Sequence, residues 1–266
     1  MKTVQAAILG ILQGITEFLP VSSSGHLVLL RSLMGLKEVP VLFDVILHVA
    51  TLIVIVWVFR QRVWSLLTAL FRFITRRSRA EDWPNLLLAL HLFSASIITA
   101  MIGLGVFSLE GRDNPTLVSL FLLASAAILL STLCSQEKCG IHEIGWWRVM
   151  LLGMVQGIGV FPGISRSGIT IGMGMISGLD RKSAGEFSFL LSIPAVFAAF
   201  LLSLRDVGEL TETVPIISLS VGFFAALATG YGSLRLLLWL ITGGRLWIFA
   251  LYLLPVGIWG VIHFGF

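Results

Sequence analysis

The stretch ILQGITEFLPVSSSGH, residues 11–26, breaks an otherwise apolar segment. Between Glu17 and His26 it places a carboxylate, three consecutive serines, a glycine and a histidine. A second stretch, MVQGIGVFPGISRSGI at residues 154–169, repeats the pattern. Proline and glycine in the middle of an apolar run interrupt a helix. Both stretches therefore predict a break in a helix at membrane depth.

The composition identifies the class of protein. The chain has 266 residues, of which 57% are hydrophobic and 12% charged, and its mean hydropathy is +0.98. Soluble domains carry about 25% charged residues, so we expect one integral membrane domain over residues 1–266. The net charge of +4 does not indicate nucleic-acid binding, because six of the 18 basic residues lie in one connecting segment, residues 60–82. That distribution is typical of a topology signal.

Six apolar stretches are long enough to span a bilayer, which takes about 20 residues. They lie at roughly 41–59, 84–106, 116–134, 186–204, 215–234 and 246–265. Two other regions, 4–35 and 147–178, are broken near the middle, and each half is too short to span. We expect re-entrant helix–loop–helix hairpins there, because non-helical backbone is tolerated in a membrane only inside protein or beside a water-filled cavity.

The two broken regions are related by an internal repeat. At a constant offset of 143, ten identities fall within residues 10–36, and most of them are Gly, Ser, Gln or Phe. The copies cover approximately 4–134 and 147–266. Three predicted spans separate the hairpins, so the second copy is inverted and the two tips can meet near the midplane, as in inverted-repeat membrane proteins. The fold class is therefore all-α, with an inverted-topology repeat.

Loop charges predict the orientation. The Arg-rich loop 60–82 is expected in the cytoplasm, as are residues 135–146 and 235–245. The loops at 107–115 and 205–214 are not basic and are expected outside. By the same count both chain ends lie outside.

The hairpin tips combine residues suited to an anion. Ser22, Ser23 and Ser24 precede a predicted helix, where they can act as caps or can join backbone N–H groups in an anion site. Arg166 stands between Ser165 and Ser167 at the second break. A charge at bilayer depth costs at least about 2.5–3.5 kcal/mol on insertion scales, and a guanidinium beside hydroxyls suits phosphate oxygens. An arginine that reaches to the membrane surface is the alternative.

Glu17 and Gln13 lie on one helix face, four residues apart. Glu17 either pairs with Arg166 or, with Gln13, ligates a divalent cation, because Mg²⁺ commonly binds one or two carboxylates plus substrate phosphates. His26 either carries a proton or makes a structural hydrogen bond. We interpret His48, His91 and Asp44 as helix-packing residues.

The motifs resemble a known family. Gln13 and Glu17, then LPVSSSGH at 19–26, PGISRSGIT at 162–170 and EFSFLLSIP at 186–194, look like the bacitracin-resistance type of membrane undecaprenyl-diphosphate phosphatase. The resemblance covers nearly the whole chain. It departs at Gln13, where some relatives have a second carboxylate.

The resemblance implies hydrolysis of undecaprenyl diphosphate to the monophosphate, which recycles the lipid carrier for peptidoglycan synthesis. It implies Mg²⁺ or Ca²⁺ dependence and a site that opens to the outer face of the bacterial inner membrane. Ser23 would be the nucleophile, assisted by Glu17 and His26, although water could attack with Ser23 as a phosphate ligand. Arg166 would bind the diphosphate. The candidate substrate-binding residues beside it are Ser22, Ser24, Gly25, Gly163, Ser165, Ser167 and Thr170.

The rival class is a transporter, since inverted repeats with broken helices are typical of transporters. Such a protein would flip undecaprenyl phosphate, alone or in addition to hydrolysis. A carrier needs an anion site but no nucleophile, so the serine, arginine and glutamate together favour the phosphatase. The expected partners are the lipid substrate and membrane lipids, with a homodimer as a further candidate and no nucleic acid.

Overall fold

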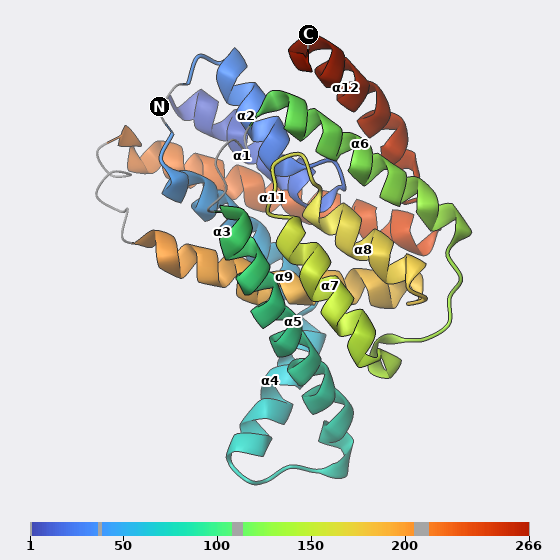
Figure 1. Cartoon of the computed structure of the whole chain (residues 1–266). Coiled ribbons are helices and arrows are strands. Elements are labelled where there is room, and N and C mark those ends of the chain that lie inside the picture. Colours follow the sequence, from blue (N-terminus) through green and yellow to red (C-terminus); the bar gives the residue numbers. More distant parts are fainter. Residues whose placement is uncertain (1, 37–38, 108–113, 205–212, 266) are drawn as a thin grey trace.

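A computed structural model describes residues 2–36, 39–107, 114–204 and 213–265, which fold into a bundle of helices (Figure 1). The long helices are α1 (Thr3–Phe18), α2 (Ser23–Leu33), α3 (Val41–Val58), α4 (Arg60–Ile74), α5 (Trp83–Phe107), α6 (Pro115–Ser131), α7 (Trp146–Ile158), α8 (Arg166–Ile176), α9 (Arg181–Ser203), α11 (Ile216–Thr242) and α12 (Ile248–Gly265). Three short 3₁₀ helices, η1 (Ala80–Asp82), η2 (Thr132–Cys134) and η3 (Ile141–Glu143), lie in the connections.

Six described helices are long and apolar enough to cross a membrane: α3, α5, α6, α9, α11 and α12. Their most apolar 18-residue windows have mean hydropathies from 1.5 to 2.6. The predicted all-α membrane fold with six spans is confirmed, and α3, α5 and α6 are the three spans between the broken regions. The chain is a multi-pass membrane protein.

The two broken regions form helix pairs, α1–α2 and α7–α8. Helix α1 ends at Phe18, because Leu19 turns to an extended backbone before Pro20. Helix α7 ends at Ile158, before Pro162 and Gly163. Each helix is shorter than the roughly 20 residues of a span, so this arrangement is consistent with re-entrant hairpins.

Equivalent glycines in the two copies make equivalent contacts. A Cβ on Gly10 would lie 2.2 Å from the carbonyl oxygen of Gly222 on α11, and a Cβ on Gly153 would lie 2.8 Å from that of Ala95 on α5. Gly14 and Gly157, one turn later, also lie against α11 and α5 respectively. Glycine allows this close backbone approach. The first helix of each copy thus packs on a span of the other copy, which is consistent with the predicted repeat.

Two segments predicted as loops are helical, which corrects the sequence analysis. Residues 60–82 begin with α4, whose Leu66 and Ala69 are buried at helical spacing; the arginines concealed this periodicity. Helix α11 continues to Thr242, past the predicted end at 234. Arg235 does not end the helix, because its long, exposed side chain lies near the helix end and can reach the membrane surface. The predicted outer loops at 107–115 and 205–214 lie mainly outside the described residues.

Candidate active site

The two hairpin tips meet. The Ser167 hydroxyl donates to the Phe18 carbonyl oxygen at 3.0 Å, joining the start of α8 to the end of α1. Gly168 lies so close to the first tip that an added Cβ would be 2.8 Å from the Cβ of Pro20. Residues 149 positions apart in sequence therefore form one wall.

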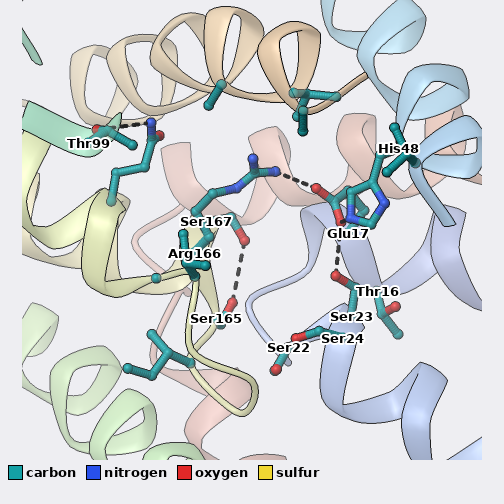
Figure 2. A pocket seen from close by; sticks show the side chains of 18 residues that line it. Thr16, Glu17, Ser22, Ser23, Ser24, His48, Thr99, Ser165, Arg166 and Ser167 are labelled. Carbon is teal, nitrogen blue, oxygen red and sulfur yellow. Dashed lines mark hydrogen bonds and ion pairs between the residues drawn. The ribbon is translucent and has the colours of Figure 1, made fainter. Parts of the chain in front are cut away.

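A cavity of about 310 Å³ opens beside these tips (Figure 2). Its polar wall comes from both copies, and its apolar wall comes from α9, α3 and the second tip, between α7 and α8. The lining residues are Thr16, Glu17, Ser22, Ser23, Ser24, Val45, His48, Thr99, Gln156, Gly159, Val160, Ile164, Ser165, Arg166, Ser167, Ala195, Val196 and Ala199. A polar end beside an apolar wall suits a ligand with a charged head and an apolar tail.

Glu17 lies at the centre of the polar wall, and its side chain is buried. One carboxylate oxygen forms an ion pair with Arg166. The other accepts hydrogen bonds from Ser23 Oγ at 2.8 Å and from Gln13 Nε2 at 3.0 Å. Figure 2 shows Glu17 between Arg166 and Ser23, each of which contacts it from a different side. A hydroxyl, a carboxylate and a guanidinium are thereby placed together.

His48, which the sequence analysis interpreted as a packing residue, lies in this cavity. Its Nε2 is 3.3 Å from Glu17 Oε2, and its Nδ1 is 2.8 Å from the Asp44 carbonyl oxygen. A carbonyl oxygen can only accept, so Nδ1 carries a hydrogen, and a hydrogen bond from Nε2 to Glu17 requires a second hydrogen, which makes the ring an imidazolium. The available signal was the placement of two polar residues, Asp44 and His48, four apart on one face of an apolar span.

His26 lies outside the cavity lining. Its Nδ1 is 2.8 Å from the Ser22 carbonyl oxygen, and its Nε2 is 2.6 Å from the Tyr252 hydroxyl. The imidazole also stacks on the Tyr252 ring. Its two nitrogens therefore connect α2 to the distant helix α12, while the histidine nearest to Glu17 is His48.

The two tips differ at equivalent serines. Ser165 caps α8, because its hydroxyl accepts from the Gly168 N–H at 3.2 Å. Ser22 has a φ of 70° and is 2% exposed, and its hydroxyl has no hydrogen-bond partner among the described residues. A buried hydroxyl without a partner is costly. Beside the start of α2 it offers a bond to a bound anion.

The other predicted substrate-binding residues divide into two groups. Ser24 and Ser167 line the cavity. Gly25, Gly163 and Thr170 are not in its lining. Gly163 has a φ of 91° and lies against Val118, where an added Cβ would be 2.3 Å from the carbonyl oxygen. Thr170 donates to the Arg166 carbonyl at 2.7 Å, one turn into α8. These three shape the tips.

The predicted cation ligands fit a weakly held ion better than a closed metal site. Glu17 lines the cavity, whereas Gln13 lies behind it and turns its amide N–H₂ toward the carboxylate. The buried Gln13 Oε1 has no partner among the described residues. No group of three or more His, Cys, Asp and Glu side chains that could hold a metal occurs in the described ranges. One carboxylate fits Mg²⁺ when substrate phosphates complete the shell.

The chain is similar to known proteins over nearly its whole length. The family model described as bacitracin resistance protein BacA matches residues 6–259. A Treponema denticola protein named undecaprenyl-diphosphatase is 42% identical over 264 residues, covering 99% of this chain and 98% of its own. Proteins of that name from Desulfosudis oleivorans and Carboxydothermus hydrogenoformans are 39% and 35% identical, and each covers 97% of this chain; the matches cover 97% and 96% of those relatives. The chain therefore belongs to the BacA bacitracin resistance family.

Proposed function

We propose that this protein hydrolyses undecaprenyl diphosphate to undecaprenyl phosphate and inorganic phosphate. One observation carries the proposal: Ser23, Glu17 and Arg166, contributed by both hairpin tips, form a continuous contact chain along one cavity wall. A site that only bound the diphosphate would need Arg166 and the backbone N–H groups of the tips. The additional hydroxyl, hydrogen-bonded to a buried carboxylate, is an arrangement for nucleophilic attack. The name shared by the curated relatives supports the same substrate.

Substrate binding changes the partners of Arg166. In the structure its guanidinium is paired with Glu17. A diphosphate in the cavity offers it oxygens that it can bind in a bidentate manner. The Ser22 hydroxyl and the backbone N–H groups at the start of α2 receive the terminal phosphate. The prenyl tail leaves along the apolar wall of Ala195, Val196 and Ala199 into the bilayer.

The chemical step then follows from the released carboxylate. Ser23 Oγ attacks the terminal phosphorus and transfers its proton to Glu17. The bond from that phosphorus to the bridging oxygen breaks, and undecaprenyl phosphate leaves. Water next attacks the phosphoserine; one of its hydrogens stays on the released phosphate, the other restores the Ser23 hydroxyl, and Glu17 releases its proton to solvent. Arg166 and the tip N–H groups stabilise the charge on the transferring group, and His48 holds the Glu17 carboxylate in position.

A divalent cation, Mg²⁺ or Ca²⁺, held by Glu17 and the substrate phosphates, would neutralise charge on the diphosphate. Gln13 orients the carboxylate from behind. We place the enzyme in the bacterial cytoplasmic membrane with the cavity open to the outer face, where it recycles the lipid carrier for peptidoglycan and supports bacitracin resistance.

The test uses purified full-length protein in detergent, a polyprenyl diphosphate and Mg²⁺, with phosphate release as the readout. Arg166→Ala and Ser23→Ala are compared with the distant Arg235→Gln. We expect loss of release in the first two only, and a phosphoserine at Ser23 after acid quench. Full activity in Ser23→Ala would make water the nucleophile. If folded wild type releases no phosphate but moves a polyprenyl phosphate from one leaflet of a liposome to the other, the transporter is favoured instead.

A further inference from the structure

The segment from α4 to the start of α5, residues 60–82, forms a hairpin that extends away from the bundle (Figure 1). It contains six arginines against Glu81 and Asp82, a net charge of four, which equals the net charge of the whole chain. The rest of the protein is therefore neutral overall. The site proposed above explains neither this charge nor this projection.

One face of α4 is apolar and uncovered. Trp64, Leu67, Phe71 and Ile74 recur at spacings of three and four, so they share a face. Trp64 is 69%, Phe71 66% and Ile74 76% exposed. At 15 residues α4 is too short to span and is not one of the six candidate spans. A short amphipathic helix with an aromatic apolar face is typical of elements that lie in a membrane interface.

Most arginines of this hairpin already have partners. Arg72 binds Asp82 at 2.9 Å, and Arg79 binds Glu81 at 3.1 Å. Arg62 pairs with Glu186, and Arg60 lies over the Trp57 ring. Both acidic residues of the hairpin are thus occupied.

Arg76 and Arg77 remain. They are exposed, directly follow the apolar face that ends at Ile74, and have no ion-pair partner among the described residues. Two free guanidinium groups at the end of an apolar stripe match a ligand with an anionic head and apolar chains. Guanidinium forms bidentate hydrogen bonds with phosphate.

We propose that the hairpin of residues 60–82 binds anionic phospholipids. Trp64, Leu67, Phe71 and Ile74 lie among the acyl chains, and Arg76 and Arg77 bind the headgroup phosphates. Each basic residue near an anionic membrane surface strengthens binding to that surface by about fivefold. This surface is separate from the cavity, and its role does not depend on which reaction the cavity performs.

The test reconstitutes the full chain in nanodiscs that contain phosphatidylcholine and phosphatidylglycerol, with one of the two lipids brominated at a time. Bromine quenches tryptophan at short range, and subtracting the signal of Trp64→Phe isolates Trp64. We expect brominated phosphatidylglycerol to quench Trp64 several-fold more than brominated phosphatidylcholine at equal mole fraction. In R76Q/R77Q the ratio of quenching by phosphatidylglycerol to quenching by phosphatidylcholine should fall to about one. In the wild type this ratio should decrease as salt is added.

The matched control is R235Q/R245Q, which removes two exposed arginines near the end of α11 and should keep the preference. Equal quenching by the two lipids in wild type overturns the proposal, as does a preference that survives R76Q/R77Q. Absence of quenching by either lipid also overturns it, because the hairpin would then stand in water and an acidic protein surface would become the candidate partner.

Discussion

Glu17 and Arg166 are 149 residues apart in sequence and form an ion pair across the two hairpin tips, in which Glu17 is buried and Arg166 partly buried. Removing one partner of such a pair is unfavourable, because the remaining charge loses its counter-ion. The pair therefore stabilises the contact between the copies and also places a cation beside the proposed nucleophile. These two contributions can be separated by mutation.

Arg166→Ala should remove both contributions. We expect kcat/KM to fall by on the order of 10²–10³-fold. The free energy of unfolding should fall by about 1.5–3 kcal/mol, because Glu17 loses a charged hydrogen-bond donor but keeps Ser23 and Gln13. The double variant Glu17→Gln with Arg166→Gln should regain thermal stability while staying inactive. Phosphate release and thermal unfolding in detergent provide the two readouts. A double variant as unstable as Arg166→Ala would contradict the charge argument.

The equivalent serines should respond differently to alanine. Ser165→Ala removes a helix cap and should lower stability by about 1 kcal/mol. Ser22→Ala removes a hydroxyl that has no partner among the described residues, so stability should hold or rise while KM for the diphosphate increases. Both variants are compared by thermal unfolding and by steady-state kinetics. Equal losses of stability would show that the tips are not functionally distinct.

Substitutions of the two histidines near the first tip should have different effects on kcat. His48→Ala deprives Glu17 of a hydrogen bond and should lower kcat about 10- to 100-fold. His26→Ala should cost less, and Tyr252→Phe should reproduce its effect, because His26 bonds Tyr252. The measurement is kcat under substrate saturation for all three variants. A larger loss of kcat in His26→Ala than in His48→Ala would indicate that His26 carries a proton in the reaction.

Gln13→Glu tests how the cation is held. A second carboxylate beside Glu17 replaces an N–H donor with a like charge, so the chelated protein should be less stable than wild type. The same change adds an oxygen ligand, so the Mg²⁺ concentration that gives half-maximal activity should fall. Chelator should abolish activity in both proteins, and Mg²⁺ should restore it. An unchanged Mg²⁺ requirement would place the cation away from Gln13.

The close approach of α1 and α11 predicts a sharp contrast between two glycines. A Cβ on Gly14 would lie 2.1 Å from Thr229 Oγ1, so Gly14→Ala should destabilise by about 1–3 kcal/mol. Gly232, on α11 itself, has open space around the same position, so Gly232→Ala should be neutral or slightly stabilising. The measurement is the thermal unfolding temperature of the two variants, each compared with the wild type. Equal stability would mean that the helices separate without cost.

The spans and the breaks could be predicted because they follow from local signals. A run such as 41–59 needs only length and apolar character, and Pro20 or Pro162 interrupts a helix wherever it stands. Helix α4 was not predicted because its arginines mask the buried positions Leu66 and Ala69. Asp44 and His48 mark a polar face on α3, but the distance from His48 to Glu17 depends on how α3 is rotated against α1, which no local pattern specifies.

The repeat places Ser23 and Arg166 at matching positions, 143 residues apart, and likewise Glu17 and Val160. A half-length ancestor that associated with a second copy could have made the glycine contacts between α1 and α11, because each copy packs its first helix on the other. It would nevertheless have presented identical tips, with two serines or two arginines facing each other. The present chain differs at these positions, so that a hydroxyl from one tip and a guanidinium from the other both contact Glu17. The glycine contacts thus use positions where the two stretches agree, whereas the proposed catalytic groups occupy positions where they differ.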